Sequence, residues 1–406
     1  MLNVVILNGG RGAATIIPSL LKHQGLNITS VVNAYDDGKS TGEIRRFFGM
    51  LGPSDIRKVQ ELMLPENDPD YQVYGNLFRY RYPIASDREK IIKELQFFVQ
   101  GTTPALADMQ FQNKKVRNAL QHFLREFLNG LSVVEKASGK LFNFTDCSMM
   151  NCIYAGAFLT FNRNIDTATR YIDRLFKLKG TVLPTSIEDK KLVALRENGE
   201  MLYSEAEIVE LRSNVRIERI YLLDSILDPG HFQALSIEEK RYYLEKNHCF
   251  VEVSESVKHA LQHADIIIYS SGTQHSSLYP TYISTGLAES IADNKAAFKV
   301  FITNIGADYE TPNYKASEYI LGAYRYLSFG DKRQYKMSDL FNVVFINQSH
   351  LKADETYVEF DEAAFKEIPV SLVVDAFESS TQPGKHDGDK IVRSIMNLYE
   401  DATLLS

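Results

Sequence analysis

The chain has little cysteine and no apolar run of membrane-spanning length. Its three cysteines, Cys147, Cys152 and Cys249, form no C-x-x-C pair. That pattern argues against a disulfide framework or a zinc site and is typical of a reducing compartment. The apolar run at the N-terminus is too short for a signal peptide and ends in a glycine loop. We therefore expect a cytoplasmic protein with no membrane partner.

The charge of the chain excludes a further class of partner. The formal net charge of the 406 residues is -7, and 44% of them are hydrophobic and 24% charged, as in an ordinary soluble globule. An acidic surface of this kind attracts neither nucleic acid nor an anionic bilayer. An anionic ligand must therefore be held by a local cluster, and we expect no nucleic-acid partner.

Two loops of small residues, at 8–12 and 270–277, each follow a β-branched run and precede a predicted helix. Backbone N–H groups exposed at such a turn form an anion site. The first loop matches neither the G-x-G-x-x-G fingerprint nor a P-loop, so tight turns that bind nothing remain the alternative. Two such loops on one sheet predict a ligand with more than one phosphate. Its expected contacts are Gly9, Gly10, Arg11 and Gly12 in the first loop and Gly272, Thr273, Ser276 and Ser277 in the second.

Strand and helix patterns alternate at both ends of the chain. Between them, residues 64–145 show helical periodicity, which we interpret as an insertion or cap; two more helices follow within 146–178, and residues 191–223 are β-rich. The pattern predicts one α/β domain over residues 1–406, with a Rossmann-like, doubly wound and mainly parallel sheet. Its other expected elements are strands at 2–7, 27–33, 265–269, 299–303 and 342–347 and helices at 13–23, 254–263, 278–293, 314–326 and from Gly388 onward.

The densest polar cluster, residues 33–42, follows the second predicted strand and faces the same crevice as the first loop. Asp36 and Asp37 are adjacent carboxylates that could hold a divalent metal or bind substrate hydroxyls. An Asx-type turn with a helix N-cap is the alternative. The residues that open the next helix, and could present hydroxyls and N–H groups to phosphate, are Ser40, Thr41 and Gly42.

Several other side chains are candidates for the same crevice. Asp55 can cap a helix whose first turn contains Arg57, and a cation there is unfavourable unless it faces an anion. Arg45 is close enough in sequence to join it, although a solvated basic face explains both arginines equally well. Asn151 is an amide in an apolar helix and needs a partner. His275 lies in the second loop, and a lone histidine is more often a structural residue than an acid–base group.

At this point the motifs resemble those of the CofD-like family. The likeness begins with the run 36–42, Arg45, Phe48-Gly49 and 53–57, and it continues in Gly180 to Thr185. It extends through the second loop to Asn304, Glu310-Thr311 and His386-Asp387. The chain departs from the family pattern at Arg11, Cys147, Met150, Ser204 and Tyr319.

The resemblance implies one of two functions. The first is transfer of a 2-phospholactyl-type group from a guanosine diphosphate adduct to a deazaflavin hydroxyl, with magnesium. Asp36 and Asp37 would then be catalytic and hold the metal, and Arg45 and Arg57 would offset phosphate charge. The second is a regulator of gluconeogenesis-factor type that binds a nucleotide-sugar without turnover and controls carbon metabolism or cell shape. The expected partner is in both cases a nucleoside diphosphate or nucleotide-sugar, and a homodimer remains open.

Overall fold

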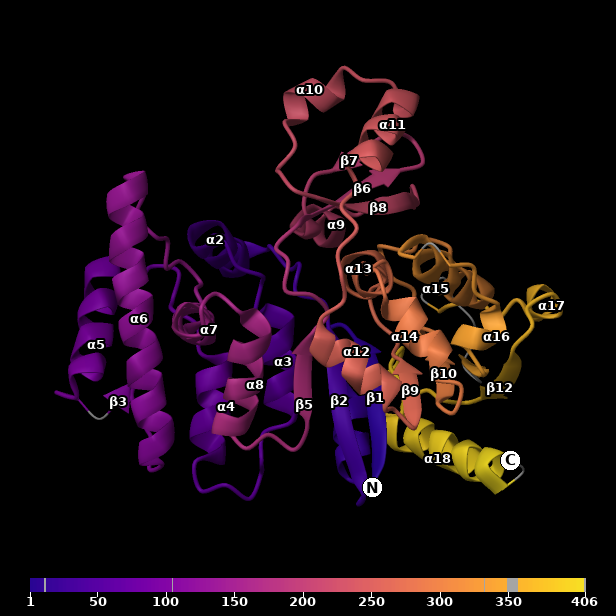
Figure 1. The fold of residues 1–406 in the computed structure, drawn as a ribbon, viewed down its shortest axis with the longest axis horizontal. Coiled ribbons are helices and arrows are strands. Elements are labelled where there is room, and N and C mark those ends of the chain that lie inside the picture. The colour runs from indigo at the N-terminus through magenta and orange to yellow at the C-terminus, as the bar shows by residue number, and fades with distance from the viewer. Residues whose placement is uncertain (11, 104, 332, 349–356, 405–406) are drawn as a thin grey trace.

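The computed structural model contains one sheet of seven parallel strands in the order β12-β11-β10-β9-β1-β2-β5 (Figure 1). It describes residues 1–10, 12–103, 105–331, 333–348 and 357–404. The parallel sheet confirms the predicted α/β class. The strands are β1 Leu2–Asn8, β2 Leu26–Val32, β5 Thr181–Pro184, β9 Ile266–Tyr269, β10 Phe298–Ile302, β11 Val343–Asn347 and β12 Ser371–Asp375.

The strand order reverses between β1 and β9. From β1 the chain proceeds to β2 and β5 on one side, whereas β9 leads to β10, β11 and β12 on the other. Leu7 pairs with Val31 on one neighbour and with Tyr269 on the other, so the loops after β1, β2 and β9 begin at the same edge. Ligands of doubly wound proteins bind at this point, beyond the carboxyl ends of the strands. Both predicted phosphate loops therefore begin side by side.

The helices cover the sheet in the manner that right-handed crossovers require. The crossover from β1 to β2 contains α1, and the crossover from β9 to β10, which runs the other way along the sheet, contains α14. Since right-handed crossovers in opposite directions lie on opposite faces, α1 and α14 cover opposite faces of the sheet. The last helix, α18, returns to pack on α1. The elements of the first half outside the cap are η1 Gly12–Ala14, α1 Ile16–Leu21, α2 Lys39–Phe48, α3 Ser54–Leu62, α7 Met149–Thr160 and α8 Ile165–Leu175.

The second half differs from the prediction in the expected helix 278–293 and in elements that were not expected, including α16 Met337–Leu340, α17 Glu362–Phe365 and β12. The expected helix 278–293 is three pieces, the π-helix η2 Gln274–Leu278, α13 Tyr279–Tyr282 and α14 Leu287–Asp293. Pro280 lacks a backbone N–H, and Gly286 adopts a φ of 84°, so the helix cannot run through. The remaining helices are α12 Glu255–Gln262, α15 Ala316–Phe329 and α18 Gly388–Leu404.

The segment 64–145 contains three helices and a short antiparallel pair. The long helix α6 packs on α5 and on α7, at one edge of the molecule (Figure 1). The strand pair β3-β4 was not expected in this segment, where strand-like runs are absent from the sequence. The elements are α4 Tyr71–Arg79, α5 Arg88–Gln100, β3 Ala105–Leu106, β4 Met109–Gln110 and α6 Lys114–Ser138.

Residues 191–247, called the small lobe below, project above the carboxyl edge of the sheet (Figure 1). Its three strands are antiparallel in the order β7-β6-β8. Val193 and Leu195 face a separate small core, whereas Leu192 and Ala194 face the main core, as strand alternation requires. The elements are β6 Lys191–Arg196, β7 Met201–Leu202, α9 Glu205–Glu210, β8 Ile217–Leu223, α10 Pro229–Gln233 and α11 Ile237–Asn247.

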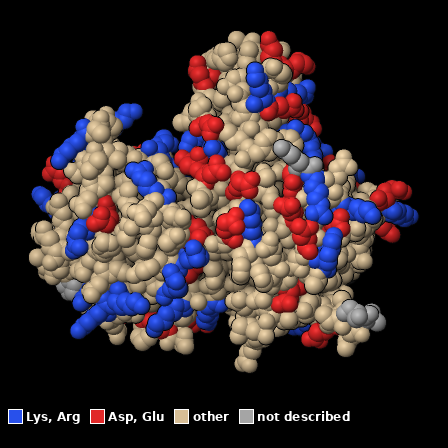
Figure 2. Space-filling view, in the orientation of Figure 1, with Lys and Arg blue, Asp and Glu red and all other residues tan. Residues whose placement is uncertain are grey.

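Acidic side chains gather where the small lobe meets the body on the face shown in Figure 2. None of the helices that the structure describes has both the length and the apolar character needed to cross a bilayer.

A close helix contact generates a stability prediction. An ideal Cβ on Gly156 of α7 would lie 1.8 Å from the backbone oxygen of Phe123 on α6. Gly156→Ala should therefore force α6 and α7 apart and lower the free energy of unfolding by about 1–3 kcal/mol, as measured by urea denaturation.

Gly130 of α6 is the matched control. An ideal Cβ there would lie 2.5 Å from Leu159 Cδ1, the far end of a side chain that can move. Gly130→Ala should cost less than about 1 kcal/mol, because the gain in helix propensity offsets the adjustment. Equal losses in the two variants would contradict this account of the contact.

Candidate functional site

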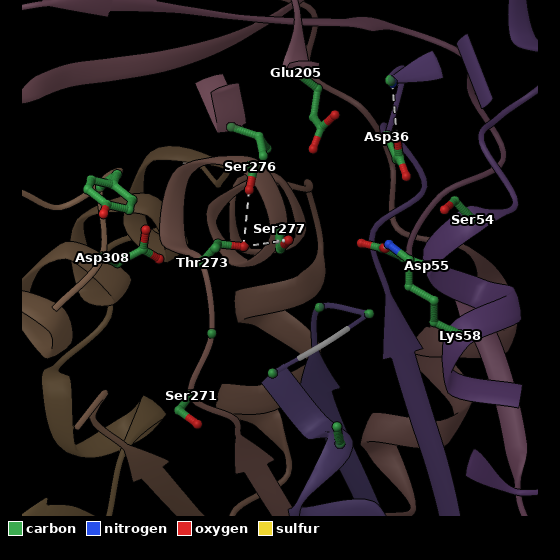
Figure 3. Close-up of a pocket in the computed structure, with 18 of the residues that line it drawn as sticks. Asp36, Ser54, Asp55, Lys58, Glu205, Ser271, Thr273, Ser276, Ser277 and Asp308 are labelled. Carbon is green, nitrogen blue, oxygen red and sulfur yellow. Dashed lines mark hydrogen bonds and ion pairs between the residues drawn. The ribbon is translucent and has the colours of Figure 1, made fainter. Parts of the chain in front are cut away.

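A pocket of about 980 Å³ opens at the switch point between β1 and β9. The first loop, the segment after β2, α9 and the second loop all contribute to its lining (Figure 3). The residues that both line the pocket and were predicted from the sequence are Gly9, Gly10, Gly12, Asp36, Ser40, Thr41, Asp55, Gly272, Thr273, Ser276 and Ser277. Arg11 lies outside the described residues.

The two loops are in direct contact, and this contact requires glycine. An ideal Cβ on Gly12 would lie 2.2 Å from the carbonyl oxygen of Ser271, and one on Gly9 would lie 2.6 Å from Ser277 Cβ. The absence of side chains at these positions lets the two loops form one continuous wall. The two loops therefore lie side by side at the pocket, and a shared ligand stays a prediction.

A second part of the pocket is acidic. Asp36, Asp55 and Glu205 face the pocket, and Asp55 forms an ion pair of 2.6 Å with Lys58 (Figure 3). Asp55 also packs against the first loop, since an ideal Cβ on Gly10 would lie 2.4 Å from its Oδ1. Burial raises the pKa of Asp36, and the negative charge of Asp55 adds to the shift. Burial likewise raises the pKa of Glu205 to about 9, with further contributions from Asp36 and Asp55. These carboxyl groups therefore lack sufficient positive partners when the pocket holds no ligand.

Asp37 does not join Asp36 in the pocket. Its carboxylate accepts a hydrogen bond of 3.0 Å from the backbone N–H of Ala206, in the first turn of α9. Asp37 therefore satisfies a free donor at a helix N-terminus, a structural role that the polar cluster could not reveal. Among the described residues, no three histidine, cysteine or acidic side chains converge to hold a metal. Asp36 and Asp37 therefore do not converge on one site at which both could hold a metal ion, as was predicted.

The two predicted arginines are buried away from the pocket. Arg45 donates to Asp189 Oδ1 at 2.5 Å, to the backbone oxygen of Tyr35 at 2.5 Å and to that of Lys190 at 2.7 Å. Arg57 donates to the backbone oxygen of Phe78. Arg45 therefore links the segment after β2 to residues 189–190, and Arg57 links α3 to the last turn of α4. The bond to Phe78 explains why a cation is present in the first turn of α3, where the helix macrodipole disfavours it.

Two more predicted residues act behind the pocket wall. Asn151 of α7 donates to Ser40 Oγ at 3.3 Å and so supports a residue that does line the pocket. Gly42 lies inside α2 and packs on the carbonyl oxygen of Asp37, 2.0 Å from the position of an ideal Cβ. Neither residue is part of the lining.

Three backbone N–H groups of the second loop already have acceptors within the protein. Gly272 N–H donates to Asn304 Oδ1 at 2.9 Å, and the N–H groups of His275 and Ser276 donate to Glu310 Oε2 at 2.9 Å each. The loop also brings the side chains of Thr273, Ser276 and Ser277 to the pocket. The His275 ring is fully enclosed beside Tyr279, and burial lowers its pKa to about 3, which supports the structural interpretation.

Cys147 and Cys152 are core residues, because both are fully buried, with sulfur atoms 3.8 Å apart.

The sequence prediction missed several lining residues. Ser54 and Lys58 belong to α3, and Lys58 could have been found because it lies one turn from Asp55. Nothing local distinguishes Glu205, Asp308 or Lys385, which only the fold brings to the pocket. The lining residues that were not predicted as site residues include Ser54, Lys58, Arg81, Asp146, Glu205, Ser271, Asn304, Asp308, Tyr309, Lys385 and His386.

Comparison with known proteins identifies the family. The sequence model of a family described as "2-phospho-L-lactate transferase CofD" matches residues 4–378. The chain belongs to the CofD family. This membership confirms the resemblance inferred from the motifs.

Relatives in this family cover the whole chain at low identity. The "Gluconeogenesis factor" of Listeria monocytogenes is 24% identical over 406 residues, which cover 98% of this chain and 96% of that protein. The protein of the same name from Listeria innocua is 24% identical over 399 residues, 97% of this chain and 94% of that one. A crystal structure of a Bacillus halodurans protein superposes with a TM-score of 0.66 at 19% identity, over 97% of this chain and 99% of that one. This last likeness shows the shared fold.

The buried carboxyl group of Glu205 in α9 leads to a prediction about how the stability of this CofD-family protein depends on pH. The pKa of Glu205 in the folded protein, about 9, lies above the ordinary value of a glutamate. As the pH rises, Glu205 therefore ionises in the unfolded chain before it ionises in the folded protein. The free energy of unfolding falls as the pH increases from the ordinary pKa of a glutamate toward 9. Glu205→Gln cannot ionise, so its unfolding free energy should exceed that of the wild type by roughly 1–3 kcal/mol near pH 9.

Denaturation with urea at a series of pH values measures this difference. The same substitution at Glu210, an exposed residue of α9, should leave the pH dependence of stability unchanged. A Glu205→Gln curve parallel to that of the wild type would contradict the account.

Proposed function

We propose that this protein binds a nucleotide-sugar at the switch-point pocket and acts as a non-catalytic regulator of the gluconeogenesis-factor type. The observation that carries the proposal is that one pocket combines the hydroxyl groups of the second loop and the glycines of both loops with the carboxyl groups of Asp36, Asp55 and Glu205. The loops suit a diphosphate, and the carboxyl groups suit the hydroxyl groups of a sugar. The names of the Listeria relatives support the same choice.

The phosphate end of the ligand would lie against the two loops. Thr273, Ser276 and Ser277 present hydroxyl groups there, next to Gly9. Lys385 also lines the pocket, and no acidic residue among those described lies within ion-pair distance of it. The positive charge of Lys385 is therefore available to a phosphate. In a protein of negative net charge, a phosphate must be held by such a local positive group.

The sugar end of the ligand would lie against the acidic part of the pocket. A carboxyl group accepts hydrogen bonds from sugar hydroxyls, and such bonds would add to those that Asp36 and Glu205 already accept from the backbone N–H groups of Gly38 and Asp37. A phospholactyl group would bring a further carboxylate toward Asp36, Asp55 and Glu205. Repulsion between like charges in a partly buried site disfavours that ligand.

The transferase remains the second candidate because Asp36 is placed as a base would be. In that reaction the acceptor hydroxyl attacks the phosphorus that carries the lactyl group, the bond to the GMP phosphate breaks, and the hydroxyl proton passes to Asp36. A buried carboxylate whose pKa is raised suits this role. A magnesium ion bound to the diphosphate would offset its charge, and Asp36 is the carboxylate that would hold it.

A ligand panel tests the proposal. We expect UDP-glucose or UDP-N-acetylglucosamine to raise the melting temperature more than UDP, GDP or uridine does, because only the sugars meet both the loops and the carboxyl groups. A ligand at about 100 times its dissociation constant stabilises by about 2.7 kcal/mol, so thermal shift detects it. Acceptor-dependent release of GMP from the guanosine diphosphate adduct would contradict the regulatory role and favour the transferase.

Two neighbouring aspartates provide a matched pair of variants for the panel. Asp36→Asn should weaken binding of the UDP-sugar and remove any strengthening by magnesium, since Asp36 lines the pocket. Asp37→Asn should leave both unchanged and lower stability by about 1 kcal/mol, since Asp37 caps α9. Equal effects of the two substitutions on binding would contradict this division of roles.

A further inference from the structure

A chain of three hydroxyl groups runs along the pocket wall that the second loop forms. Ser276 Oγ lies 3.1 Å from Thr273 Oγ1, which lies 2.8 Å from Ser277 Oγ (Figure 3). At its buried end, Ser276 Oγ lies 2.5 Å from Glu310 Oε1. The chain therefore links a buried carboxyl group to the pocket.

Glu310 is held firmly behind the loop. Its Oε2 accepts the backbone N–H groups of His275 and Ser276, and only 3% of the residue is exposed. These two bonds fix the carboxyl group, so Oε1 has Ser276 as its partner. Glu310 itself is not part of the pocket lining.

Each hydroxyl has one proton to donate, so an ionised Glu310 leaves one arrangement that keeps all three hydrogen bonds, whereas a neutral Glu310 adds a proton and allows the chain to run outward. If Glu310 is ionised, Ser276 donates to it, Thr273 donates to Ser276 and Ser277 donates to Thr273. Ser277 then offers only lone pairs to the pocket. If Glu310 is neutral, it donates to Ser276, and the chain runs outward to Ser277. Among the described residues no other acceptor lies near the Ser277 hydroxyl, so its proton then faces the pocket.

We infer that neutral Glu310 is a positioning residue that turns the chain outward and makes Ser277 a donor to a ligand phosphate. The inference rests on the proposed function, because it requires an anionic group beside Ser277. A phosphate oxygen accepts hydrogen bonds and cannot donate them when ionised, so only the outward chain matches it.

The surroundings of Glu310 favour its neutral form near neutral pH. Burial raises its pKa to about 8, and the negative charge of Asp308 adds to the shift. The other titratable groups around it are His275 on η2, which burial keeps neutral, and Tyr319 on α15, whose pKa burial raises. Asp308 also has a pKa raised by burial.

The pH dependence of UDP-glucose binding, measured by calorimetry, tests the role of Glu310. Wild-type affinity should fall about tenfold from pH 7 to pH 9, since about a tenth of a group with a pKa of 8 is protonated at pH 9. Glu310→Gln keeps an acceptor for the two N–H groups and donates to Ser276, so its affinity at pH 7 should match the wild type.

The affinity of Glu310→Gln for UDP-glucose should also no longer show the part of the pH dependence that comes from the titration of Glu310. Glu205 titrates in the same range and is present in both proteins, so the difference between their curves isolates Glu310. Identical curves for wild type and Glu310→Gln would overturn the inference.

A double-mutant cycle tests the chain itself. Thr273→Val removes the central hydroxyl with little change in shape, and Ser277→Ala removes the last one. Ser277→Ala should weaken UDP-glucose binding roughly 10- to 100-fold, the effect of losing a hydrogen bond to a charged group. Thr273→Val leaves Ser277 without an acceptor in the chain, so it should remove the part of the pH dependence that Glu310 controls. The double variant should be no weaker than Ser277→Ala alone, because both changes break the same chain.

A double variant weaker than Ser277→Ala, or a Thr273→Val variant that keeps the wild-type pH dependence, would overturn the chain and leave the proposed function standing. A wild-type protein that binds neither UDP-glucose nor inorganic pyrophosphate would overturn the proposed function and the inference together. Binding of pyrophosphate with the expected pH dependence, but not of UDP-glucose, would support the chain and overturn only the sugar part of the proposed function.

Discussion

The contact between the loops after β1 and β9 is the constraint on which the rest of the site depends. The two strands are neighbours at the reversal of the sheet, and Gly12 allows the first loop to lie against the Ser271 carbonyl. Any side chain at Gly12 would separate the loops and divide the wall that faces the ligand. The wall in turn faces the segment after β2, because β1 and β2 end at the same level. The topology thus determines the pocket before any polar side chain is considered.

Electrostatics then divides the pocket into two parts. The acidic part holds carboxyl groups whose pKa values burial has raised, and the second loop holds hydroxyl groups in a hydrogen-bonded chain. Such a site stores unfavourable energy that a ligand with complementary groups releases on binding. α9 connects this acidic part to the small lobe, because Glu205 belongs to the helix that Asp37 caps. A ligand that meets Glu205 therefore acts directly on the element joining the small lobe to the body.

The sequence predicted the sheet and the loops better than it predicted individual side chains. β1, β2, β9, β10 and β11 are rich in apolar residues, whereas β5 has only four residues and ends in Pro184, and β12 is a half-exposed edge strand. The glycine loops were found because strand-to-helix turns restrict their composition. Arg45 and Arg57 were expected at the pocket, yet their donors are used by backbone carbonyls that lie far from them in sequence. Glu205 and Lys385 carry no local signal at all, since only the tertiary fold brings them to the pocket.

The central claim is that a diphosphate lies between the two loops at the switch point. A crystal structure of the protein with UDP-glucose tests it most directly. The account predicts diphosphate oxygens within hydrogen-bond distance of Ser277 Oγ and beside Gly9 and Gly10, with the sugar hydroxyls toward Asp36 and Glu205. A diphosphate bound anywhere else, for example on the helices of the segment 64–145, would contradict it.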